Sequence, residues 1–149
     1  FIITANYPFR IYKHIFHVGA SMFFQSGFML WLARLLNVVP IDPDTQLMKA
    51  MKAGAIGLKH GKVLNIYPEG ERAFDGELHD FKKGAAILAT ELDLPILPVA
   101  IDGVYKVRFG EPFYPKNVVD DSLTDEAKYE IVTAHLKSEI RKMIDEMRK

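Results

Sequence analysis

Apolar residues recur along this chain with two spacings, and segments of the two kinds alternate. Continuous or alternating apolar runs, typical of strands, occupy residues 10–18, 37–41, 62–67, 95–102 and 105–113. Spacings of three and four, typical of helices, occur within residues 17–39, 44–61, 83–93 and 124–149. This alternation predicts a single α/β domain over residues 1–149, with a mixed, largely parallel sheet flanked by helices. Because the run at 62–67 is continuous, we expect that strand to be buried on both faces.

Individual residues refine the predicted helices. Asp44 can accept hydrogen bonds from the first backbone N–H groups of the helix that follows it, and Gly61 can end that helix. Thr124 begins the last helix, which is amphipathic to the end of the sequence. Its predicted inward face carries Val132, Leu136, Ile140, Met143 and Met147.

The helix predicted within residues 17–39 is the most apolar part of the chain. Polar residues interrupt it, Gln25 and Arg34 among them, so it is not read as a membrane span. Its apolar stripe is expected to belong to the core, or to the core with one edge that faces lipid. The stripe comprises Phe24, Phe28, Trp31, Leu32, Leu35 and Leu36.

Composition excludes several classes of function. Nineteen basic side chains balance nineteen acidic ones, so charge does not point to a nucleic-acid partner. The absence of cysteine excludes a disulfide framework and a thiolate zinc site. His14 and His17 lie three apart on a predicted strand, where their side chains would face opposite sides. We therefore predict no metal site.

Charged residues crowd the segment that follows the strand at 62–67. Pro68 ends that strand, Gly70 permits a tight turn, and the Arg72 guanidinium suits phosphate or carboxylate. Lys82 and Lys83 then stand at the start of a helix, where a bound anion would be favourable. Two interpretations stay open on spacing alone. Either the segment binds an anion, or Glu69 pairs with Arg72 and the lysines are solvated.

The letters of this region resemble the glycerolipid acyltransferase family, which includes the lysophosphatidic acid (1-acylglycerol-3-phosphate) acyltransferases. The resemblance rests on three ordered blocks: YPEGERA at 67–73, FKKG at 81–84 and PILPV at 95–99. It implies transfer of a fatty acyl group from acyl-CoA or acyl-ACP, as co-substrate and without a bound cofactor, to a hydroxyl of a lysophospholipid-type acceptor. It also implies that Glu69, Gly70 and Arg72 position the acceptor's head group, with Lys82 and Lys83 as weaker contacts.

The family's general base belongs to a His-x-x-x-x-Asp motif, and none of the five histidines has Asp five positions later. We therefore expect this chain to be an N-terminally truncated part of an acyltransferase domain, inactive by itself. The alternatives are a non-catalytic lipid-binding domain of the same fold and a phosphate-sugar or nucleotide-binding α/β module. Glu71 and Pro43 replace residues that the family uses near its acceptor, which also allows a less anionic acceptor.

The same resemblance implies the surroundings of the protein. Acceptor lipids reside in bilayers, so we expect association with a membrane surface at its cytoplasmic face. The partners implied are the lipid acceptor and the acyl thioester, and a fused or associated acyl-activating domain is compatible with the Glu-Gly-Glu-Arg letters at 69–72.

Overall fold

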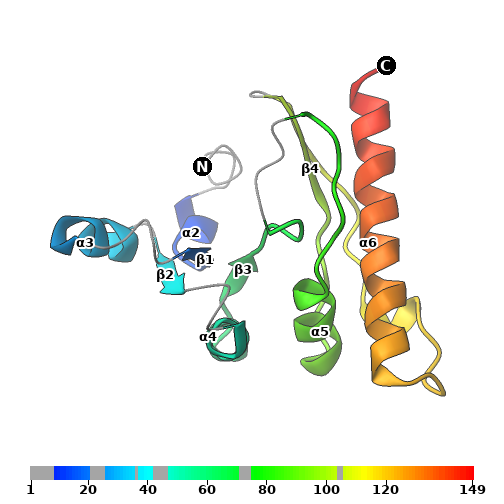
Figure 1. Cartoon of the computed structure of the whole chain (residues 1–149), viewed down its shortest axis with the longest axis horizontal. Helices are drawn as coiled ribbons and strands as arrows, with labels where there is room; N and C mark the ends of the chain where they lie inside the picture. Colours follow the sequence, from blue (N-terminus) through cyan, green and yellow to red (C-terminus); the bar gives the residue numbers. More distant parts are fainter. Residues whose placement is uncertain (1–8, 21–25, 36, 42–46, 71–74, 104–105) are drawn as a thin grey trace. The chain divides into compact units, whose positions relative to one another are not determined.

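The computed structural model describes residues 9–20, 26–35, 37–41, 47–70, 75–103 and 106–149 (Figure 1). The described residues fall into two compact units, one within Tyr7–Ile66 and the other within Tyr67–Lys149. Each unit has a sheet of its own, parallel in the first and antiparallel in the second.

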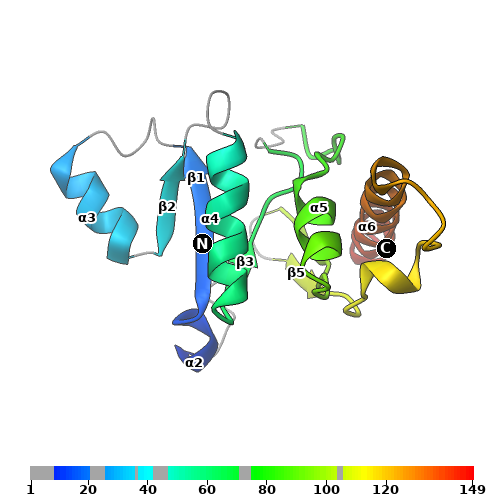
Figure 2. The same ribbon diagram turned by 90° about the horizontal axis from the view of Figure 1, so that it is seen from below.

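The first unit is built on a three-stranded parallel sheet of order β2-β1-β3. In this sheet His17 of β1 pairs with Val38 of β2, and Phe16 pairs with Leu64 of β3. Gly57 of α4 lies against the Phe16 ring, so the helix packs closely on β1 (Figure 2). The elements in chain order are α2 Phe9–Tyr12, β1 Ile15–Ala20, α3 Gly27–Leu35, β2 Val38–Ile41, α4 Leu47–Lys59 and β3 Val63–Asn65.

Three predicted boundaries in this unit were wrong, and one of them is the strand predicted at 62–67, which covers only Val63–Asn65. The segment 10–18 is not one strand: α2 takes its first residues, and His14 closes a turn by donating its backbone N–H to Ile11 O at 2.8 Å. The four residues of α2 are too few for the apolar pattern to separate a helical turn from a strand. The helix predicted from residue 17 begins only at Gly27, because residues 17–20 belong to β1.

Burial in the first unit also departs from expectation. Three residues of the stripe on α3 are not core: Phe28, Trp31 and Leu35 are 66%, 58% and 59% exposed, whereas Ala33 is buried. The β3 strand is not buried on both faces, because Val63 is 49% exposed, and among the described strands β3 pairs with β1 alone. Gly61 ends α4 as predicted, with φ +71° and its N–H donated to Leu58 O. Phe24, Leu36 and Asp44 lie outside the described residues.

The second unit packs a long helix against an antiparallel pair of strands. Its elements are α5 Gly84–Glu91, β4 Val99–Asp102, β5 Lys106–Phe109, the short 3-10 helix η2 Pro115–Asn117 and α6 Asp125–Met147. Ala100 of β4 is buried with Leu136, Ile140 and Met143 of α6, which form one apolar cluster. Thr124 caps α6 by accepting the Ala127 N–H at 3.4 Å.

The strand predicted at 95–102 is shorter than expected. Regular pairing begins at Val99, and before it Ile96 makes only an isolated bridge with Phe113. Pro95 and Pro98 lack the N–H groups that a continuous ladder requires. The α/β class itself is confirmed, with a parallel sheet flanked by helices.

Candidate functional site

The charged segment begins with a tight turn at residues 67–70. The Gly70 N–H donates to Tyr67 O at 3.0 Å, which closes the turn around Pro68. Proline favours the second position of such a turn, and Gly70 adopts φ +75°, a left-handed conformation that a side chain disfavours. Gly70 therefore permits the turn as the sequence predicted, whereas the strand that Pro68 was expected to end stops earlier, at Asn65.

Lys82 returns to this turn from twelve residues further along the chain. Its backbone N–H donates to Pro68 O at 2.8 Å. Its side chain lies across Gly70, where a Cβ would be 2.8 Å from Lys82 Cε and 2.9 Å from Nζ. The missing side chain of Gly70 thus lets an ammonium group lie directly on the turn.

Glu69 binds the same return segment from the other side of the turn. Its Oε2 accepts the backbone N–H of His79 at 3.0 Å. The His79 ring in turn contacts Asp75, with 2.9 Å between Nε2 and Oδ2. These bonds connect Glu69, His79 and Asp75 in series, so the backbone N–H of His79 orients the Glu69 carboxylate.

The Asp75 carboxylate accepts two hydrogen bonds at the end of this series of contacts. The hydrogen bond from His79, and after it the Glu77 N–H at 3.0 Å, lower the pKa of the Asp75 carboxyl. Asp75 therefore forms the turn that its residue type suggests. Sequence reasoning missed its bond to His79, because a four-residue spacing brings side chains together in a helix and residues 75–79 are not helical.

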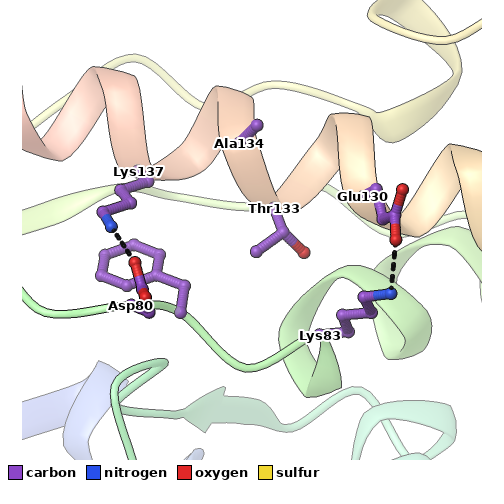
Figure 3. Close-up of a pocket in the computed structure, with 7 residues that line it drawn as sticks. Asp80, Lys83, Glu130, Thr133, Ala134 and Lys137 are labelled. Carbon is purple, nitrogen blue, oxygen red and sulfur yellow. Dashed lines mark hydrogen bonds and ion pairs between the residues drawn. The ribbon is translucent and has the colours of Figure 1, made fainter.

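Lys83 faces α6 rather than the turn. Its Nζ donates to Glu126. It also donates to Glu130 at 2.9 Å (Figure 3). These bonds, that with Glu126 foremost, raise the pKa of the Lys83 ammonium. Two consecutive lysines thus have different neighbours, a distinction that the sequence does not carry.

A shallow hollow of about 220 Å³ lies beside Lys83, between the segment before α5 and α6 (Figure 3). A second ion pair lies at this hollow, with Lys137 Nζ 2.6 Å from Asp80 Oδ1. Its residues are Asp80, Phe81, Lys83, Glu130, Thr133, Ala134 and Lys137. The charged groups at this hollow are bonded to one another, which leaves the turn at 67–70 as the better anion site.

The structure brings together Glu69, Gly70 and Lys82 of the predicted site residues. Arg72 lies outside the described residues, and the roles of all five predicted residues stay predictions. Within the described ranges no group of three or more histidines and carboxylates is placed to hold a metal ion. None of the helices in the described part of the chain is long and apolar enough to cross a membrane.

Comparison with known proteins gives consistent results. Residues 2–102 match the family model described as Acyltransferase. The chain is 34% identical over 99 residues to the chloroplastic 1-acyl-sn-glycerol-3-phosphate acyltransferase BAT2 of Brassica napus, covering 64% of this chain and 28% of that protein. It is 35% identical over 95 residues to the 1-acyl-sn-glycerol-3-phosphate acyltransferase of Pseudomonas aeruginosa, covering 61% and 37%. The chain therefore matches well under half the length of these curated relatives.

A solved structure shares the fold. The crystal structure of the 1-acyl-sn-glycerophosphate (LPA) acyltransferase PlsC from Thermotoga maritima superposes with a TM-score of 0.66. The superposition covers 89% of this chain and 56% of that chain, at 22% sequence identity.

Proposed function

Because the chain belongs to the Acyltransferase family, we propose that the protein transfers a fatty acyl group from an acyl thioester to a hydroxyl of a lysophospholipid-type acceptor. The hydroxyl oxygen attacks the thioester carbonyl, an ester bond forms, the carbon–sulfur bond breaks, and the thiol leaves with the proton. Acyl-CoA and acyl-ACP are the two candidate donors. The names of the curated relatives support 1-acylglycerol-3-phosphate as the acceptor to test first.

One observation carries the head-group assignment: the Lys82 ammonium lies on the left-handed turn at Gly70. A phosphate placed there would meet a cation and the start of α5, where Lys83 occupies the cap position without a side-chain cap bond. Helix N-termini attract anions through their unpaired N–H groups. We assign Lys82 as the principal anion contact among the described residues.

The other predicted residues have supporting roles in this proposal. Glu69 holds the turn through His79, and Gly70 provides the space that Lys82 occupies. Arg72 supplies a planar cation for the phosphate. Lys83 remains a weaker contact, since a head group would compete with Glu126 and Glu130 for its ammonium.

The general base is assigned to the His-x-x-x-x-Asp motif that the family uses, which no histidine of the printed sequence forms. A histidine in that motif would take the hydroxyl proton as the oxygen attacks, and its aspartate would fix the ring orientation. The activity is therefore assigned to the full-length protein.

The direct test measures acyl transfer by the full-length protein, with acyl-CoA or acyl-ACP as donor. The acceptor is 1-acylglycerol-3-phosphate or the matched monoacylglycerol without phosphate. Lys82→Met should raise KM for the phosphorylated acceptor about tenfold, the value of one lost charged hydrogen bond, and leave the neutral acceptor unaffected. Lys142→Met is the matched control, because Lys142 is exposed on α6 and has no hydrogen bond or ion pair in the described part of the chain.

Each outcome of this test bears on a different statement. Acyl transfer that prefers the neutral acceptor would overturn the phosphate assignment, in the direction that Glu71 and Pro43 suggest. Lipid binding without turnover by any donor would favour the non-catalytic lipid-binding domain. Arg72→Ala should abolish acyl transfer in a protein that remains folded, and full activity in that variant would remove Arg72 from the site.

We also propose that the protein binds a membrane surface, at the cytoplasmic face where acyl thioesters are available. The exposed apolar residues of α3 support this proposal. The ring centroids of Phe28 and Trp31 lie 6.0 Å apart, and the two exposed rings together present an aromatic surface suited to the lipid interface. The Phe28→Ser/Trp31→Ser variant should lose flotation with phosphatidylglycerol-containing vesicles. Ile131→Ser, which removes an exposed apolar residue of α6, should float normally.

Trp31 provides an independent measurement, since it is the one tryptophan of the printed sequence. Vesicles should shift the part of the emission that Trp31→Phe removes toward shorter wavelength. Flotation that survives the double variant, with no shift of this emission, would show that α3 does not contact lipid.

A further inference from the structure

The helix α6 and its C-cap residue Arg148 contact the segment that leads from the turn at 67–70 to α5, through a series of polar bonds in antiparallel order. We call residues 75–83 the linking segment. As the linking segment advances, its partners recede along α6: Gly76 O accepts from Arg148 at 2.7 Å, Leu78 O from Arg141 at 3.3 Å, Asp80 from Lys137 at 2.6 Å, and Lys83 donates to Glu130 at 2.9 Å. Figure 1 shows the linking segment running beside α6 toward α5.

The dimensions of the two chains explain this regular pairing. From residue 130 to residue 148 a helix rises about 27 Å, at 1.5 Å per residue. From residue 76 to residue 83 an extended chain covers about 23 Å, at 3.3 Å per residue. The linking segment has no helix or strand before α5, so its backbone carbonyls are free to accept from α6. Long arginine, lysine and glutamate side chains make up the remaining difference in length.

The linking segment has a second set of contacts, which point to the turn at 67–70. The backbone N–H groups of His79 and Lys82 donate to Glu69 Oε2 and Pro68 O. Most of the linking segment contacts α6, and within it the backbone N–H groups of His79 and Lys82 contact the turn. The linking segment therefore transmits the position of α6 to the turn.

Apolar packing adds to this arrangement. Leu78 and Phe81 pack against the buried cluster that contains Leu136, Ile140 and Met143 of α6. The charged bonds lie at the exposed margin, where each alone contributes little and several together define one register. Lys137 and Asp80 illustrate this: the hydrogen bond and the charge of Lys137 lower the pKa of the Asp80 carboxyl, although that carboxylate is exposed.

We propose that α6 is a positioning helix for acceptor binding: its polar bonds hold the linking segment in register, and thereby place Lys82 on Gly70. This inference rests on the proposed function for its kinetic consequence, but not for its structural one. Residues beyond 102 lie outside the matched family model, so the model does not assign this role to α6.

The structural consequence is measured by hydrogen exchange in the full-length protein. The variant Lys137→Met/Arg141→Met/Arg148→Met keeps an unbranched apolar stem at each position and removes the charged donor groups of three residues. The amides of His79 and Lys82 should exchange at least threefold faster in it than in wild type, and should be unchanged in Lys142→Met. Unchanged exchange in a folded triple variant would overturn the proposal, whether or not the protein shows acyl transfer.

A charge exchange keeps the test decisive if the triple variant fails to fold. Lys137→Asp places a carboxylate opposite Asp80 and should speed exchange at His79 and Lys82. Asp80→Lys/Lys137→Asp restores an opposite pair and should return exchange to within twofold of wild type. If the double variant behaves no better than Lys137→Asp, the pair does not set the register and the proposal fails.

The kinetic consequence separates positioning from loss of fold. In Lys137→Asp, KM for the phosphorylated acceptor should rise about threefold to tenfold, with kcat and the KM for the acyl donor nearly unchanged, and the double variant should reverse the rise. A fall in kcat alone would contradict the positioning role. Faster exchange without activity on any acceptor would support the structural role of α6 and refute the proposed function.

Discussion

The side chain of Lys82 occupies the space in which Gly70 would carry a Cβ. A Cβ built at Gly70 would lie 2.8 Å from Lys82 Cε and 3.0 Å from Cδ, closer than such atoms approach. Gly70 also has φ +75°, so its lack of a side chain serves both the turn and the contact. The two requirements can be separated experimentally, because other glycines of the same unit meet only one.

Gly70→Ala should cost stability and displace Lys82 from the turn. The left-handed backbone alone costs about 1–2 kcal/mol for a residue with a Cβ. Gly103→Ala is the matched control, since Gly103 has φ +64° with nothing within 4 Å of its would-be Cβ. Urea unfolding should give similar losses for the two variants, whereas acceptor KM should rise only for Gly70→Ala. Equal KM values would show that Lys82 works without this contact.

Much of the fold could be predicted from residues that act on the backbone near them. Thr124 caps α6, Gly61 ends α4 and Pro68 with Gly70 shapes the turn, because each residue acts on backbone within a few positions of itself. The α/β class could be predicted because helices and strands each impose a local spacing on their apolar residues. Such features need no knowledge of distant contacts, and the structure confirms them.

Other features depend on partners far along the chain, and the sequence could not give them. Lys82 and Lys83 look equivalent as letters, yet Lys83 pairs with residues 43 and 47 positions away. The apolar stripe on α3 has the period of a core helix, and which of its faces is covered depends on tertiary packing. Arg72 was identified from its residue type and from the family's letters, and its placement lies outside the described residues.

The Asp75 and His79 pair predicts a response to acid. Because the bond from His79 lowers the pKa of Asp75, this carboxyl should titrate below its ordinary value of 3.8. The contribution of the pair to stability should be complete above that value and lost as pH falls through the lowered pKa. Carbon-detected NMR of the carboxyl should show this midpoint in wild type. His79→Ala should return most of the shift, and an unchanged midpoint would mean that His79 is not its cause.

The contact between Gly57 and Phe16 predicts that Gly57→Ala destabilises the protein, the reverse of the usual effect in a helix. In a helix interior, glycine to alanine usually stabilises by about 1 kcal/mol. At Gly57 a Cβ would lie 2.4 Å from Phe16 Cζ, and Phe16 is buried, so overpacking of about 1–3 kcal/mol should exceed that gain. Gly57→Ala should therefore lower Tm. In the Phe16→Leu background the same change should be neutral or stabilising, and equal effects in both backgrounds would exclude the clash.

The hydrogen bond between Tyr129 and Glu91 predicts a raised pKa for the Tyr129 phenol. This pKa reports on the packing of α5 against α6. Tyr129 donates its hydroxyl to Glu91 Oε1 at 2.6 Å, which raises the pKa of Tyr129 from 10.0 to about 12. The bonded form is the protonated one, so its stabilising effect is complete below the pKa of the unfolded state and lost as pH rises through the pKa of the folded state.

The tyrosinate absorbance of wild type minus Tyr129→Phe isolates this residue among six tyrosines. Glu91→Gln keeps an oxygen acceptor but removes the charge, so it should lower the midpoint toward 10.0 without abolishing the bond. A midpoint near 10.0 already in wild type would show that α5 and α6 are not joined through this pair.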